Sequence, residues 1–139
     1  MANTNTQGLQ VVPPNLNRVQ RQFIPATQTT VALGVSASGT TYLCTPSGNN
    51  QTITLPSPIG NAGVNYKFIK IAGGNQLTVS SNAANLTGFV NGGGNYASAA
   101  GKTSVTLQAG VAGEFITVVS DNTNYVIYAA AKGGTIGLA

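Results

Sequence analysis

The sequence predicts an all-β fold: a compact β-sandwich or jelly roll of eight to nine short antiparallel strands, preceded by an extended N-terminal arm. Short runs rich in Thr, Val, Ile and Tyr recur between turns rich in Gly, Asn and Ser. No stretch after residue 27 sustains a helical period. Because 139 residues make one ordinary domain, we expect a single β domain at 28–139 behind an arm at 1–27.

The segment 1–27 is rich in Asn and Gln, and its prolines oppose a continuous helix. It also carries seven large apolar residues, which a solvated tail does not need. It is either such a tail or an arm that becomes ordered on a neighbouring subunit, and the apolar content favours the arm. The candidate attachment residues are Arg18, Arg21, Phe23 and Ile24.

The expected strands alternate with turn residues along the rest of the chain. Those at 52–55, 76–80 and 103–108 alternate between apolar residues and Thr or Ser, so we expect one face in the core and the other in solvent. The short polar loop 121–123 predicts a final hairpin. In order, the expected strands run over 28–35, 40–44, 52–55, 66–71, 76–80, 86–90, 103–108, 114–120 and 124–130.

The final hairpin is apolar on both faces, and a two-layer domain covers only one of them. The other face is covered by the arm of the same chain or by another subunit. Two groups of side chains are expected to share a face: Phe115, Val119, Tyr125 and Ile127 on one, and Ile116, Val118, Val126 and Tyr128 on the other. We expect Phe115 and Ile127 in the core and the second group, led by Val126 and Tyr128, at a subunit interface.

The composition excludes most catalytic chemistry. The chain has no His, one Cys, and only Glu114 and Asp121 as acidic side chains. Cysteine-cluster zinc sites, disulfide frameworks and imidazole bases are therefore excluded, and Cys44 is expected to be a core residue. We expect a non-enzyme with no catalytic residues, no metal and no cofactor.

The formal charge of +4 reflects scarce acids more than dense bases, because the six basic residues are scattered. That pattern argues against nucleic acid as a partner. With only 6% charged residues, the surface is better suited to contact with other proteins. The N-terminal residues lack a signal-peptide pattern and no run is long enough to span a bilayer. We therefore expect synthesis in a cytoplasm and no membrane insertion.

From 51 to 128 the chain resembles small β domains of virion proteins, in bacteriophage tail fibres or spikes and in capsid-decorating proteins. The resemblance is carried by I-T-L-P at 53–56, by Y-K-F at 66–68 after a Gly-containing loop, and by V-S-D-N-T-N-Y-V-I at 119–127. Members of the family often have Trp where this chain has Tyr125.

The resemblance implies a viral structural protein of the virion: a homotrimeric decoration, cement or spike component whose partners are other capsid or fibre proteins. The alternative is a fibre head that binds a host receptor or a host-surface glycan. The candidate receptor residues are Asn91, Asn95 and Tyr96, in the Gly-rich segment 91–101.

Overall fold

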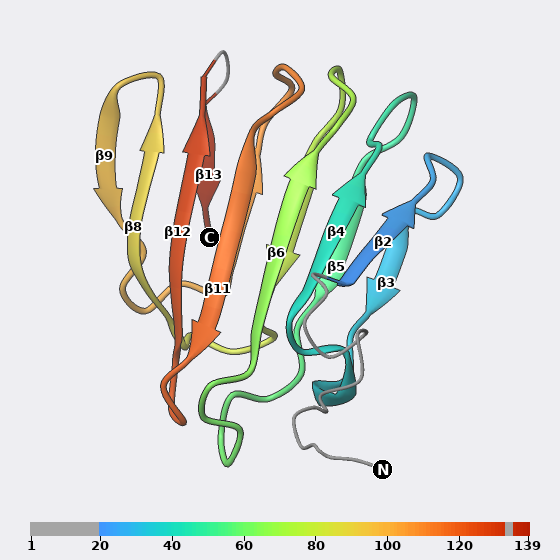
Figure 1. Ribbon diagram of the computed structural model, residues 1–139. Helices are drawn as coiled ribbons and strands as arrows, with labels where there is room; N and C mark the ends of the chain where they lie inside the picture. The colour runs from blue at the N-terminus through green and yellow to red at the C-terminus, as the bar shows by residue number, and fades with distance from the viewer. Residues whose placement is uncertain (1–19, 133–134) are drawn as a thin grey trace, which may run out of the picture.

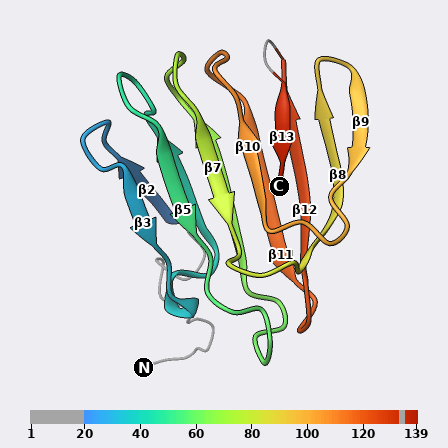
Figure 2. The ribbon, with the colours of Figure 1, turned by 180° about the vertical axis from the view of Figure 1, so that it is seen from behind.

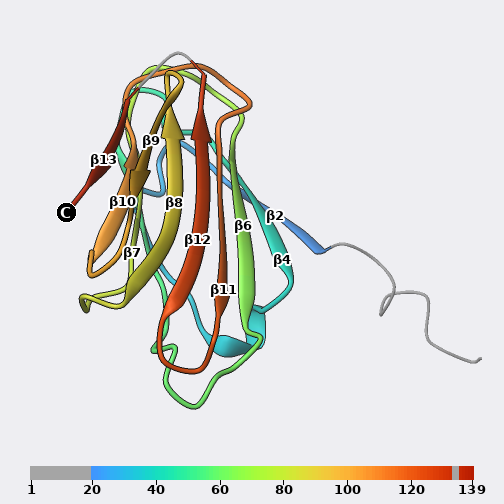
Figure 3. The same cartoon turned by 90° about the vertical axis from the view of Figure 1, so that its left-hand side faces the viewer.

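The computed structural model describes residues 20–132 and 135–139. Within them lie twelve strands, β2 to β13, and one short 3-10 helix, η2 at Val35–Ala37. The strands form two sheets that face each other like the layers of a sandwich, as the edge-on view of Figure 3 shows. The prediction of an all-β, sandwich-like fold is confirmed, with more strands than the eight or nine expected.

The larger sheet has seven strands and lies in front in Figure 1. In spatial order they are β2 (Gln20–Ile24), β4 (Thr40–Cys44), β6 (Asn65–Lys70), β11 (Phe115–Ser120), β12 (Tyr125–Ala131), β8 (Leu86–Gly92) and β9 (Asn95–Ser98). The five-stranded sheet lies in front in Figure 2. Its order is β13 (Ile136–Leu138), β10 (Ser104–Leu107), β7 (Leu77–Ser80), β5 (Gln51–Thr54) and β3 (Thr30–Ala32).

The strands are not all antiparallel, so that part of the prediction is wrong. Of the ten strand pairs in the described residues, five are parallel. Four of these pairs follow from the connectivity of the first half of the chain, and the fifth joins β8 to β12. The steps β2 to β3, β4 to β5 and β6 to β7 each cross from the larger sheet to the smaller one. As a result β2, β4 and β6 lie side by side in the larger sheet and β3, β5 and β7 in the smaller one, each parallel to the next. A jelly roll is built from antiparallel Greek keys, and this coiled connectivity differs from it.

β2 shows that the expected arm is not wholly separate from the domain. β2 is the edge strand of the larger sheet, and it pairs in parallel with β4. The side chain of Ile24 is buried in the core, and the buried amide of Gln51 donates a hydrogen bond of 2.8 Å to the carbonyl of Pro25. Residues 20–25 therefore belong to the sandwich, while 1–19 lie outside the described residues.

The core fills the space between the two sheets. As predicted, the apolar side chains of the alternating strands point inward, and Ile53, Leu77 and Val105 are fully buried. Aromatic residues of the larger sheet add bulk, with the rings of Tyr42 and Phe68 stacked at 5.6 Å between centroids. The predicted core position of Cys44 is confirmed as well, since its side chain is fully buried.

One ion pair is enclosed near one end of the sandwich. The Lys70 ammonium lies 3.5 Å from the Glu114 carboxylate, and both side chains are at most 1% exposed. Lys70 also donates a 2.8 Å hydrogen bond to the carbonyl of Gln108, just after β10. The pair thereby ties β6 and the start of β11 to the smaller sheet.

Burial raises the pKa of side chains in the larger sheet. It raises the pKa of the Cys44 thiol to about 12. Burial also raises the pKa of Tyr66 to about 12, with smaller contributions from nearby Tyr125 and Tyr42. Tyr66 remains polar at its tip, where its hydroxyl donates a 2.9 Å hydrogen bond to the carbonyl of Gly34.

Replacing Lys70 by Met should lower the free energy of unfolding by about 3–5 kcal/mol, because it leaves the Glu114 carboxylate buried without its ammonium. Adding Glu114→Met removes that charge and should recover most of the loss. Urea denaturation of the three proteins measures both effects. If Lys70→Met alone were as stable as the unmodified protein, this account of the ion pair would be contradicted.

Stability should be nearly constant from about pH 5 to pH 8 and should fall above about pH 9. In that alkaline range the unfolded chain loses the thiol proton of Cys44, whereas the folded chain keeps it. The unfolded state is therefore favoured as pH rises. Cys44→Ala should make the decline shallower by about 1.4 kcal/mol per pH unit, measured by urea denaturation. Equal slopes in the two proteins would show that Cys44 does not titrate in this way.

Candidate functional site

The outward side of the seven-stranded sheet, here called the outer sheet face, carries most of the exposed apolar residues. Six of the ten large hydrophobic residues exposed in the described chain lie on strands of this sheet. They are Phe23, Phe89, Tyr96, Val119, Val126 and Tyr128, with exposures from 45% to 72%. Soluble monomers rarely expose large contiguous apolar patches, so the part of this face where such side chains adjoin one another is the candidate site.

Strand register gathers these side chains into rows. One row crosses all seven strands and consists of Phe23, Leu43, Ile69, Phe115, Ala130, Asn91 and Tyr96. The next row holds Tyr128 beside Phe89, and the row beyond places Val119 opposite Val126. We call Phe89, Val119, Val126 and Tyr128 the hairpin patch. It lies over β8, β11 and β12.

The hairpin pairs differently from the prediction. Val119 lies opposite Val126, so Phe115 and Val119 share the outer sheet face with Val126 and Tyr128. The loop contains four residues, 121–124, where three were expected, and a one-residue shift moves a whole strand to the opposite face. Asp121 stabilises the longer loop, because its carboxylate accepts hydrogen bonds from the backbone N–H groups of Thr123 and Asn124.

Two of the expected interface residues are therefore in the core. Ile116 and Val118 are at most 1% exposed, whereas Val126 and Tyr128 are each 45% exposed. Phe115, expected in the core, is half-buried on the outer sheet face, while Ile127 lies in the core. Only Val126 and Tyr128 of the four candidates can contact another subunit.

Aromatic contacts order the middle of the outer sheet face. The rings of Phe115 and Tyr128 lie 5.9 Å apart between centroids. The Lys67 ammonium sits 5.5 Å from the centroid of Phe115, a cation–π geometry. Side chains held in this way lose less conformational entropy when a partner covers them.

The charged side chains on the strands of this face are positive. Arg21 and Lys67 lie on it, in one row across β2, β4 and β6, and both residues are exposed. The acidic side chains lie elsewhere: Glu114 is buried, and Asp121 is in the β11–β12 loop. Hydrogen bonds from the backbone of Asn124 and Thr123 lower the pKa of Asp121.

The candidate attachment residues are only partly brought together. Arg21 and Phe23 are exposed on β2, with Phe23 on the outer sheet face, but Ile24 is buried. Arg18 lies outside the described residues. Of the candidate receptor residues, Asn91 is half-buried on β8 and pairs with the exposed Tyr96 on β9, while Asn95 is exposed at the start of β9.

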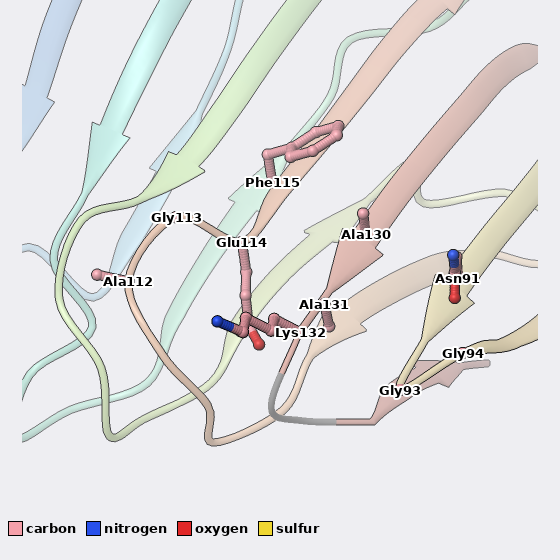
Figure 4. A pocket seen from close by; sticks show the side chains of 10 residues that line it. All are labelled: Asn91, Gly93, Gly94, Ala112, Gly113, Glu114, Phe115, Ala130, Ala131 and Lys132. Carbon is pink, nitrogen blue, oxygen red and sulfur yellow. The ribbon is translucent and has the colours of Figure 1, made fainter.

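A pocket of about 580 Å³ opens where β8, β11 and β12 meet the loops at one end of the sheet. Figure 4 shows Ala130 on β12 between the longer side chains of Phe115 and Asn91. The remaining lining comes from two loop segments and the end of β12, namely Gly93, Gly94, Ala112, Gly113, Glu114, Ala131 and Lys132.

Sequence reasoning missed Phe89 and the pocket. Phe89 stands in the expected strand 86–90, but only the register with β12 shows that it lies beside Tyr128. Gly88 precedes it with a φ of 108°, and a Cβ there would collide with the backbone carbonyl of Ile127. Glycine at this position lets β8 approach β12 closely. A glycine inside an expected strand was therefore the sequence signal that β8 lies against another strand at this point.

No protein-family model matches the chain, and no curated protein matches it. Within residues 20–132 and 135–139, no group of three or more His, Cys, Asp or Glu side chains could hold a metal ion. The same residues include no helix long and apolar enough to cross a membrane. Function is therefore inferred from the outer sheet face and the pocket.

Proposed function

We propose that the protein is a structural component of a virion, a decoration, cement or spike protein whose copies assemble as a homotrimer through the hairpin patch. The observation that carries this proposal is the exposure of Phe89, Val119, Val126 and Tyr128 on neighbouring strands of one sheet face. Covering them removes apolar surface from water at roughly 25 cal/mol per Å². The resemblance to phage β domains supports a role in the virion and an assembly of three copies.

Self-association fits the rest of the surface. The chain has eight charged residues in 139, so charge repulsion offers little protection against contact between copies. A closed ring of identical subunits buries the hairpin patch of every copy and prevents open-ended growth.

Attachment to the virion is assigned to the N-terminal segment together with β2. Arg21 and Phe23 are exposed at the edge of the larger sheet, where residues 1–19 join it. Arginine binds carboxylates through paired hydrogen bonds, so the partner surface is expected to carry acidic residues beside an apolar site. This location separates attachment at β2 from assembly at β8, β11 and β12.

Val126→Asp should convert the trimer into a monomer, because it places an unpaired charge in a desolvated contact. Light scattering should show the mass falling from three copies of the 14.0 kDa chain to one. Val111→Asp is the matched control, since Val111 is also 45% exposed but lies in a loop away from the patch. A monomeric unmodified protein, or an unchanged trimer in the Val126 variant, would refute the proposed interface.

Deleting residues 1–19 should leave a folded trimer that no longer joins the virion. The deletion stops short of the buried Ile24, so circular dichroism should still show the β-sheet spectrum of the sandwich. In the full-length chain, Arg21→Ala should lower incorporation, with Lys102→Ala as the control on the far side of β8 from β2. Purified particles with and without the variants provide the measurement. Normal incorporation of the truncated chain would show that attachment lies elsewhere.

A further inference from the structure

The pocket beside the hairpin patch is a consequence of register. Ala130 on β12 stands between Phe115 on β11 and Asn91 on β8, so a short side chain has a longer one on either side (Figure 4). Two strand spacings separate the backbones of β11 and β8, roughly 10 Å in all. The volume of about 580 Å³ falls within the range of small-molecule sites, roughly 300–1,000 Å³. The result is a trough with an apolar floor and an aromatic ring on one side.

Two cations accompany this aromatic ring. The Lys67 ammonium lies 5.5 Å from the centroid of Phe115, and Lys132, which follows β12, belongs to the pocket lining. Both lysines are exposed. The basic residues are scattered along the sequence, but the fold places one of them beside Phe115 and another in the pocket that Phe115 lines.

Little negative charge opposes these lysines. Glu114 also lines the pocket, but its side chain is only 1% exposed and its carboxylate lies 3.5 Å from the Lys70 ammonium. Asp121, the other acidic residue of the chain, lies beyond the far end of β11, about 20 Å along the strand from Phe115. The pocket therefore presents a net positive charge to a ligand.

We infer that this pocket binds one base of a single-stranded nucleic acid. The base packs against the Phe115 ring over Ala130, and the neighbouring phosphates meet Lys67 and Lys132. Proteins that hold single strands combine the same two elements, aromatic side chains on which bases stack and positive charge along the backbone. A duplex keeps its bases stacked inside, so a trough for one ring favours an unpaired strand.

This site uses none of the residues assigned to assembly or attachment. The hairpin patch borders it, since the ring of Tyr128 lies 5.9 Å from that of Phe115. The pocket itself opens on the other side of Phe115, over Ala130 and the loops at the end of the sheet. Binding of nucleic acid therefore goes beyond the proposed structural role, and the oligomeric state can be measured independently of it.

The test is fluorescence anisotropy of the full-length protein with labelled oligo(dT) of about twelve nucleotides, at low and at moderate salt concentration. We expect the single strand to bind and a blunt duplex of the same length to bind at least tenfold more weakly. Phe115→Leu should raise the dissociation constant at least fivefold, because stacking on an aromatic side chain contributes about 1–3 kcal/mol per base.

The two lysines are tested through the salt dependence of binding. Lys67→Ala and Lys132→Ala should each weaken binding and reduce the slope of log affinity against log salt by about 0.7, the value for one phosphate contact of a single strand. Lys102→Ala is the matched control. It removes the same charge at the opposite end of β8, where Lys102 forms a bridge with Leu86.

Thermal melts and light scattering establish that each variant is folded and keeps the assembly state of the unmodified protein. A single strand that does not bind at low salt would overturn the proposal. So would a duplex that binds as tightly as the single strand, or binding that the three pocket variants weaken no more than Lys102→Ala does. None of these outcomes bears on the trimer, which the Val126 variant tests.

Discussion

The register between β11 and β12 determines which side chains of the hairpin are buried in the core and which are exposed on the outer sheet face. Pairing Val119 with Val126 sends Ile116, Val118 and Ile127 into the core and leaves Tyr128 and Val126 outside. The four-residue loop capped by Asp121 fixes that register. Because β8 and β6 flank the hairpin, the same register also sets the row that contains the pocket. The hairpin patch and the pocket therefore depend on the length of one loop.

The inward faces of the two sheets and the outer sheet face differ in whether the chain itself covers their apolar side chains. The inward faces are complete within the chain, including an ion pair enclosed between the sheets. The outer sheet face is not, since it exposes aromatic and aliphatic side chains, with Arg21 and Lys67 on the same face. Another copy can cover the apolar hairpin patch near β8 and β12. The cationic edge at β2 suits a chemically different, acidic partner. In the proposed function, one sheet serves assembly over β8, β11 and β12 and attachment at its β2 edge.

Alternation along single strands was enough to predict the all-β class and the buried residues of β5, β7 and β10, such as Ile53 and Leu77. The pairing of strands was harder to predict than their positions, because an alternating pattern along one strand does not show to which sheet the next strand belongs. The steps β2 to β3 and β4 to β5 cross between sheets, so neighbours became parallel. The predicted hairpin loop was one residue too short, so the prediction placed Phe115 in the core and Ile116 at the interface. In the structure Phe115 lies on the outer sheet face and Ile116 in the core. The pocket depends on three strands meeting and has no local signature in the sequence.

Hydroxyl-radical footprinting of the unmodified protein tests most directly whether the outer sheet face is covered by other copies. Phe89 and Tyr128 are 62% and 45% exposed in one chain, and Ile59, at 70%, lies in a loop and provides an internal reference. The account predicts that Phe89 and Tyr128 are oxidised several-fold more slowly in the assembled protein than in a monomeric Val126→Asp variant, while Ile59 is unchanged. Equal oxidation of Phe89 and Tyr128 in both proteins would contradict it.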